Sequence, residues 1–255
     1  SVFGSWLSSS HCFAKALECD CTKPKVWYEL GNAGGGDISG NWMTNVDCYI
    51  KALDLNAYSA KTWSRLGQAG GGVVSNRRMP EVACHVRALE LDPKLPGGWT
   101  QLGNVGGGFV HGEHISQLDC FIKDLELDAD NSIAWCNLGI LGGGVVGGSR
   151  MSASECLVKS LTVNPNDSRT WTALGSIGGG CFLGKDVSNR DCYIRALELD
   201  TSNSFAWNNL GAAGGGTASD QVMCDVDCFT RALDINPKYS KAWFNLGNAG
   251  GGVVS

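Results

Sequence analysis

Seven glycine triplets are the first feature of the sequence that could do chemistry, because glycine-rich loops can cradle phosphate groups. The segment "LGNAGGG" stands at 30–36 and again at 246–252, with close variants between them. A phosphate loop needs a preceding strand and a lysine followed by serine or threonine after its last glycine. These triplets are followed mostly by Val-Val, Asp-Ile or Phe-Val. We therefore interpret the triplet as a joint in the chain and expect no phosphate cofactor.

Twelve cysteines raise the question of a metal site or a disulfide framework. Seven of them are periodic: Cys12, Cys48, Cys84, Cys120, Cys156, Cys192 and Cys228. Equivalent positions of successive helical repeats lie about 9–10 Å apart, which is beyond the reach of a disulfide. No C-x-x-C pair and no Cys–His cluster of zinc spacing occurs. The sequence predicts buried small apolar cysteines and no metal, with Cys136 the first to react with thiol reagents.

A column of basic residues could form a track for a polyanion. Its members are Lys15, Lys51, Arg87, Lys123, Lys159, Arg195 and Arg231. An acid stands four residues earlier in five copies, and another usually follows three residues later, as at Asp54 and Glu90. This spacing is typical of a solvated helix surface that neutralises itself. The net charge of −5 also argues against nucleic acid as a partner.

The remaining candidates for catalysis and membrane binding are weak. His111 and His114 could share a ligand, but no nucleophile or carboxylate pair accompanies them, so we expect no catalytic residue and no enzyme. No apolar run approaches the roughly 18 residues of a membrane span, so membrane insertion is not expected.

The spacing of all these residues comes from a tandem repeat. The tryptophans stand 36 residues apart at Trp27, Trp63, Trp99, Trp135, Trp171, Trp207 and Trp243. The chain holds seven such periods and three further residues. Self-similarity at a fixed period indicates an array of repeats, and we predict a single array over residues 1–255.

One period predicts two helices joined by a bend. In the unit 61–96, Trp63, Leu66 and Gly67 form the apolar stripe of a short first helix, and Gly67 permits close approach of a neighbouring helix. Each glycine costs about 1 kcal/mol inside a helix, so the triplet is predicted to end it. The second helix begins at S/T-x-x-acid caps, as at Thr44 and Asp47.

These units resemble tetratricopeptide repeats. The resemblance is carried by "AWNNLG" at 206–211 and "RALDINP" at 231–237, and it extends over essentially the whole chain. The Sel-one-like cousins of this family share a period near 36 and a glycine-rich joint. The resemblance implies an all-α, right-handed α-solenoid of about seven helix-turn-helix repeats that acts as a non-enzymatic scaffold.

The resemblance also implies a concave face lined by the first helices. In this sequence its partner-binding positions are Tyr28, Asn32, Lys61, Arg65, Gln68, Asn104, Arg169, Phe205, Asn208, Lys241, Phe244 and Asn248. Their amides could bind an extended peptide, and Lys61 with Arg65 resembles part of a carboxylate clamp. Ile133, Cys136 and Ile140 make the same face apolar in the fourth unit.

Two functions follow from this sequence. The first is a structural or protein-interaction array that is part of a longer array or stacks end to end with further copies into a filament. The second is an adaptor that binds peptides in the concave groove. The first is favoured because the sequence opens and closes on two complementary half-units.

Overall fold

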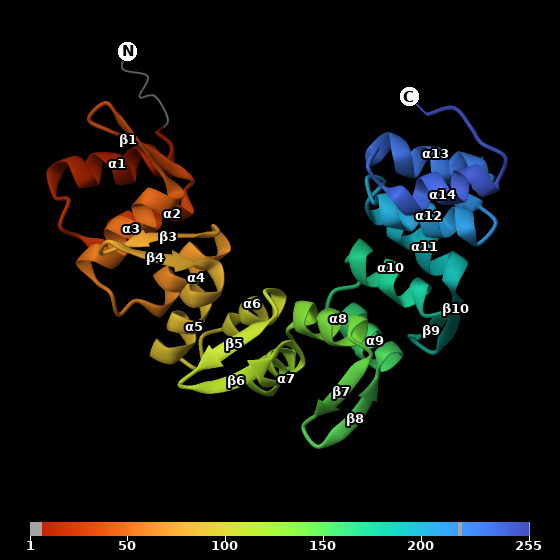
Figure 1. The fold of residues 1–255 in the computed structure, drawn as a ribbon, viewed down its shortest axis with the longest axis horizontal. Coiled ribbons are helices and arrows are strands. Elements are labelled where there is room, and N and C mark those ends of the chain that lie inside the picture. Colours follow the sequence, from red (N-terminus) through yellow and green to blue (C-terminus); the bar gives the residue numbers. More distant parts are fainter. Residues whose placement is uncertain (1–6, 219–220, 255) are drawn as a thin grey trace, which may run out of the picture. The chain divides into compact units, whose positions relative to one another are not determined.

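The computed structural model describes residues 7–218 and 221–254. The chain divides into two compact units, Ser1–Leu127 and Asp128–Ser255. Within each unit the chain repeats one pattern of helix, β-hairpin and helix (Figure 1). The predicted helix pairs are therefore confirmed. The right-handed sense of the solenoid, and its continuity as one array over residues 1–255, stay predictions.

The helices alternate between two types. The first helices carry the periodic tryptophans and are α2 (Pro24–Asn32), α4 (Ala60–Gln68), α6 (Gly98–Asn104), α8 (Ser132–Ile140), α10 (Ser168–Ser176), α12 (Ser204–Ala212) and α14 (Ser240–Asn248). The second helices carry the periodic cysteines and are α1 (Ser9–Cys19), α3 (Asn45–Leu55), α5 (Glu81–Leu91), α7 (Gln117–Leu127), α9 (Ala153–Val163), α11 (Asn189–Leu199) and α13 (Asp225–Ile235).

Between a first helix and the following second helix lies a two-stranded antiparallel hairpin. The six hairpins are β1 (Gly35–Ile38) with β2 (Asn41–Thr44), β3 (Gly71–Val74) with β4 (Arg77–Pro80), β5 (Gly107–Val110) with β6 (Glu113–Ser116), β7 (Gly143–Val146) with β8 (Ser149–Ser152), β9 (Gly179–Phe182) with β10 (Lys185–Ser188), and β11 (Gly216–Ala218) with β12 (Gln221–Met223). The expectation of an all-α fold is therefore wrong at the joint of the repeat.

The glycine triplet forms the bend at which each first helix passes into its hairpin. Gly142 and Gly143 have φ of 102° and 91°, and Gly144 pairs with Met151 in the strands that follow. The predicted bend is confirmed. The hairpin closes with two residues of positive φ, Gly147 at 56° and Gly148 at 79°. Positive φ at both turn residues is typical of a type I′ turn, which suits the twist of a two-residue hairpin.

A glycine near the end of each first helix lets the second helix approach closely, as predicted from Gly67. A Cβ atom at Gly67 would lie 2.6 Å from Cε1 of His85 on α5. The same overlap recurs with Tyr49 over Gly31 and with Phe229 over Gly211. A ring of α3, α5, α7, α11 and α13 therefore rests on bare backbone, and Leu157 of α9 takes the same place over Gly139. The tight packing of each pair depends on this glycine.

The indole of each periodic tryptophan makes a hydrogen bond to the loop that precedes its helix. In Trp63 the indole Nε1–H donates to the carbonyl oxygen of Ala57 at 2.8 Å, and in Trp207 it donates to Thr201 at 2.9 Å. All seven tryptophans make this bond six residues back. Buried indole N–H groups need a partner, so this bond fixes the turn from one repeat into the next.

The predicted caps of the second helices are present. The Thr44 hydroxyl accepts from the Asp47 amide at 3.2 Å, while the Thr44 amide donates to the Asp47 carboxylate at 3.0 Å. Reciprocal boxes also start α9 and α11. In α13 the thiol of Cys224 takes the place of the hydroxyl. At these helices the cap fixes where the hairpin ends and the second helix begins, whereas α5 begins after Pro80 without a side-chain cap.

The periodic cysteines of the second helices are buried as predicted, with the exception of Cys12 on α1. Cys48, Cys84, Cys120, Cys156, Cys192 and Cys228 have no exposed surface. Burial raises the pKa of Cys48 to about 12 and that of Cys84 to about 11. The expectation for Cys136 is wrong, because its side chain is only 1% exposed and packs in the core of the second unit.

We expect thiol reagents to separate the cysteines into two groups in dilute, folded protein. The exposed thiols should react fast, and they are Cys12, Cys19, Cys21, Cys181 and Cys224. The seven buried thiols should react only after denaturant is added, because burial opposes thiolate formation. Labelling followed by peptide mass spectrometry measures this. Fast labelling of Cys136 or Cys156 without denaturant would contradict the packing described above.

Candidate protein-interaction surfaces

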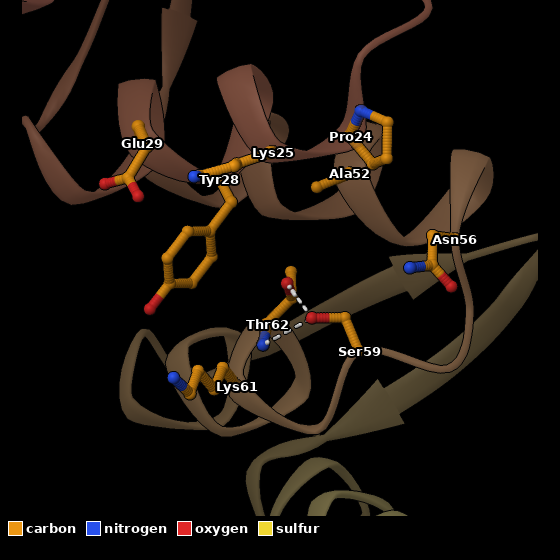
Figure 2. Close-up of a pocket in the computed structure, with 9 residues that line it drawn as sticks. All are labelled: Pro24, Lys25, Tyr28, Glu29, Ala52, Asn56, Ser59, Lys61 and Thr62. Atoms are coloured by element: carbon orange, nitrogen blue, oxygen red, sulfur yellow. Dashed lines mark hydrogen bonds between the residues drawn. The ribbon is translucent and has the colours of Figure 1, made fainter.

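A pocket on the first helices of the first unit brings together two of the predicted binding residues, Tyr28 and Lys61. Its volume is about 280 Å³, and it is lined by Pro24, Lys25, Tyr28, Glu29, Ala52, Asn56, Ser59, Lys61 and Thr62. Figure 2 shows Tyr28 and Lys61 at one end of the pocket and Asn56 at the other. The hydroxyl groups of Ser59 and Thr62 lie 2.7 Å apart between them. The pocket therefore offers an aromatic ring, an ammonium group and hydroxyl groups to a ligand.

The other predicted residues of this unit lie outside the pocket. Asn32 accepts from the Tyr49 hydroxyl at 3.1 Å and donates to Glu29. Arg65 donates to Gln68 at 3.0 Å, one turn along the same helix. Asn104 is exposed near the end of α6. Lys61 thus shares a pocket with Tyr28, while Arg65 is bonded along its own helix.

In the second unit the predicted face is partly closed by its own amides. Asn208 has no exposed surface, accepts from Asn245 at 2.9 Å and donates to Asn209. The prediction that Asn208 contacts a partner is therefore wrong, because its side-chain amide hydrogen-bonds α12 to α14. Lys241, Phe244 and Asn248 are exposed on α14. Exposed Phe205 packs against Tyr239, with 5.0 Å between the ring centroids.

Two further pairings tie the first helices of this unit together. Asn203 donates to the hydroxyl groups of Ser168 and Thr172 at 2.8 and 3.0 Å. Arg169 donates to Asn137 on α8. These polar groups stabilise the stack of first helices. Ile133 and Ile140 remain exposed on α8, as expected for the apolar fourth unit.

The basic column lies on the second helices, and five of its seven members have a local partner. Lys15, Arg87 and Arg195 pair with the acid three residues later, at 2.6 to 3.2 Å. Lys123 and Lys159 instead lie over the rings of Trp99 and Trp135, 5.4 and 5.7 Å from the centroids. The pairing uses the later acid rather than the acid four residues earlier. The described residues contain no group of three or more potential metal ligands.

His85 is a buried histidine without hydrogen bonds. His85 on α5 stands at the position in the repeat where α3 has Tyr49 and α7 has Phe121, and it is 1% exposed. This place in the second helix is called the ring position. Within the described residues neither ring nitrogen has a partner. Glu81 on the same helix is the charged group nearest to it, 4.0 Å from Nε2. Burial lowers the pKa of His85 from its ordinary 6.5, and Glu81 opposes this shift.

We expect the first unit to lose stability in mild acid because of His85. The unfolded chain binds a proton near pH 6.5 and the folded chain does so only at lower pH, so the free energy of unfolding falls as the pH drops below about 6.5. His85→Phe, which copies the residue of α7, should remove this dependence. Thermal melting of both proteins from about pH 7.5 to about pH 5.5 measures the difference. The prediction is wrong if the melting temperatures of the wild type and of His85→Phe fall by the same amount as the pH is lowered.

One end face lies on α14. Trp243 is 47% exposed, whereas Trp207 at the equivalent position is 3% exposed. A Cβ atom at Gly247 would meet no atom within 4 Å, unlike one at Gly211, which would lie 2.7 Å from Cε1 of Phe229. The face on which a second helix normally packs is therefore open at α14 in the described part of the chain.

The complementary face lies on α1. Cys12 is exposed, although its equivalents on the six other second helices have no exposed surface. Phe13, at the ring position, is half-buried, while Tyr49 is 4% exposed. Within residues 7–218 and 221–254, the open side of α1 is the one that packs on a first helix in the other repeats. The two open faces, Trp243 with Gly247 and Cys12 with Phe13, match the two sides of an ordinary helix pair.

No helix in the described residues has both the length and the apolar character of a membrane span. The chain matches no protein-family model and no curated protein sequence.

Solved structures share its fold. A Sel1 repeat protein from Oxalobacter formigenes aligns over 93% of this chain and 94% of its own, with 18% identity and a TM-score of 0.52. The antigen c5321 of uropathogenic Escherichia coli, described as having an SLR fold, covers 95% of this chain with 19% identity and a TM-score of 0.59. Yeast Tom70 covers 94% with 13% identity and a TM-score of 0.52. The chain spans 52% of c5321 and 50% of Tom70. It therefore has the repeat fold of the Sel1-like and tetratricopeptide repeat proteins.

Proposed function

We propose that this protein is a non-enzymatic repeat scaffold in which a helix of the second type covers the open face of α14. That helix belongs either to a further repeat of a longer array or to α1 of another copy, and the second case is developed here. The open face at Trp243 and Gly247 carries the proposal. A large apolar residue left half exposed beside bare backbone indicates an interaction site. A following repeat of the same type would cover this face in the same way.

The packing of the other repeats supports α1 as the occupant. In α12 and α13 the ring of Phe229 rests on Gly211, and Cys228 is buried beside it. On α1 the corresponding residues are Phe13 and Cys12. Phe13 over Gly247 would reproduce that contact between two copies. Such a contact is heterologous, so repetition of it builds an open chain of copies rather than a closed dimer.

Sedimentation velocity over a range of protein concentrations tests this proposal. The wild-type protein should form species larger than the monomer as its concentration rises. Gly247→Phe should remain monomeric, because its ring has room in the free chain and fills the space that Phe13 needs. Asn248→Ala, on the same helix, should associate like the wild type. A monomer at every concentration, or association of Gly247→Phe equal to that of the wild type, would count against self-assembly.

A second candidate function is peptide binding at the pocket of Tyr28 and Lys61. It is favoured because two residues predicted from the repeat pattern line the same cavity. An array of extended peptides, probed with wild-type protein and with Tyr28→Ala and Lys61→Ala, tests this function. Peptides retained only by the wild type would support an adaptor. If no peptide distinguishes the wild type from both variants, this candidate is rejected.

A further inference from the structure

A second hollow of the first unit shares no lining residue with the pocket of Tyr28 and Lys61. It is bounded by the loop after α3, the hairpin of β3 and β4, helix α5, and Phe109 on β5 of the next repeat. Its volume is about 720 Å³. We call it the Phe109 groove and define it by Arg77, Met79, Val82, Val86, Arg87 and Phe109. Sites of this size hold a ligand as large as a short peptide segment.

The walls of the Phe109 groove are apolar and open to solvent. Phe109 is 64% exposed, and Val82 is exposed beside it on α5. The Phe109 ring contacts His114 edge to face, with 5.0 Å between the ring centroids. Met79 and Val86 complete the apolar wall. Exposed apolar side chains gathered in one hollow indicate a binding surface rather than scattered surface residues.

The chain itself supplies a comparison for this groove. Two repeats later the equivalent hollow is lined by Met151, Ser154, Glu155, Val158, Lys159 and Cys181. There Ser154 stands where the Phe109 groove has Val82, and Cys181 stands where it has Phe109. Glu155 stands where it has Ala83. At these three positions the Phe109 groove has the more apolar residues, and its one lining carboxylate, Glu90, is paired with Arg87.

The rim of the Phe109 groove is positive. Arg87 is paired with Glu90 at 3.2 Å. The side chain of Arg77 on β4 is exposed and has no hydrogen bond or ion pair within the part of the chain that the structure describes. A guanidinium beside apolar walls favours a carboxylate whose neighbours are apolar. One unpaired arginine is too little charge for the phosphate run of a nucleic acid.

We propose that the Phe109 groove binds an extended peptide segment in which apolar and acidic residues alternate. Its apolar side chains pack on Val82, Val86 and Phe109, and one of its carboxylates pairs with Arg77. The groove crosses from one repeat into the next, and an extended chain with alternating side chains suits that path. This site is separate from the end faces, so Gly247→Phe should leave it intact.

Fluorescence anisotropy with a fluorescein-labelled peptide of alternating leucine and glutamate tests the proposal. Arg77→Glu and Phe109→Ser should each weaken binding about ten-fold or more. Both side chains are exposed, and unchanged helical circular dichroism confirms folding. If either variant loses helicity, Arg77→Gln replaces it. Raised salt should also weaken binding.

Matched controls come from the equivalent positions of other repeats. Val145→Ser corresponds to Phe109→Ser, and Gln221→Glu corresponds to Arg77→Glu, and neither should change the affinity. The proposal is wrong if the wild type does not bind the peptide, or if the two groove variants bind it as the wild type does. It is also wrong if a peptide of alternating leucine and lysine binds equally well.

Discussion

Replacing Gly143 by alanine should destabilise the second unit by about 2–5 kcal/mol. A side chain at positive φ costs about 1–2 kcal/mol. In addition, the new Cβ would lie 2.1 Å from the carbonyl oxygen of Met151, at a φ of 91°. Backbone atoms held in a hairpin cannot move away cheaply, so the overlap adds about 1–3 kcal/mol. Thermal melting compared with the wild type measures the loss.

Gly142 provides the matched control. It also has positive φ, 102°, but a Cβ there would meet nothing within 4 Å. Gly142→Ala should therefore cost only the backbone strain, about 1–2 kcal/mol. If the triplet were helical, both substitutions would instead stabilise the protein by about 1 kcal/mol each. A raised melting temperature for Gly143→Ala would show that the bend is wrongly described.

The same substitution should have opposite effects at Gly211 and Gly247. Gly211→Ala places a methyl group 2.7 Å from Cε1 of Phe229 and 3.0 Å from the carbonyl oxygen of Asp225. We expect a loss of about 1–3 kcal/mol, as for other overpacked sites. Gly247→Ala has no neighbour within 4 Å and should stabilise α14 by up to about 1 kcal/mol through helix propensity.

Melting of the two variants in dilute solution, where any association is absent, gives the signs of these effects. Equal and opposite shifts are not required, but the signs must differ. Destabilisation by both substitutions would mean that Gly247 is already covered in the single chain. In that case the open face proposed on α14 would not exist.

The repeat period made most of the fold predictable from the sequence. Helix stripes such as Trp63, Leu66 and Gly67, and caps such as Thr44 with Asp47, depend on neighbouring residues that a single sequence displays. The burial of the periodic cysteines was predictable from their fixed position after the cap of the second helix. These features are local. The helix stripe recurs in all seven copies, and the S/T-x-x-acid cap recurs in four of them.

The hairpins were missed because their signals are short and uneven. Each strand has only three or four residues, which is too few for a clear alternation. Gly147 with Gly148 is a recognisable turn pair, but Leu183 adopts a φ of 51° at the equivalent position of another repeat. The recurrence of a two-residue turn at a fixed place after every triplet would have been a better guide than the residue types.

The binding residues were harder to predict than the fold. Asn208 and Cys136 occupy positions that the repeat pattern assigns to an open face, yet both are buried by neighbouring first helices. Their burial depends on amide and side-chain contacts between repeats, such as Asn245 with Asn208, which the sequence of one unit cannot show. Tyr28 and Lys61 share a pocket to which α2, α3 and α4 all contribute residues.

The labelling rate of Cys12 as a function of protein concentration tests self-assembly most directly. Cys12 is exposed on α1 in the single chain, while its equivalents between paired helices have no exposed surface. If α1 packs on α14 of another copy, the reaction with iodoacetamide should slow as the concentration rises, while Cys181 on β9 keeps its rate. Gly247→Phe should make both rates constant. A rate for wild-type Cys12 that does not change with concentration would contradict the proposed assembly.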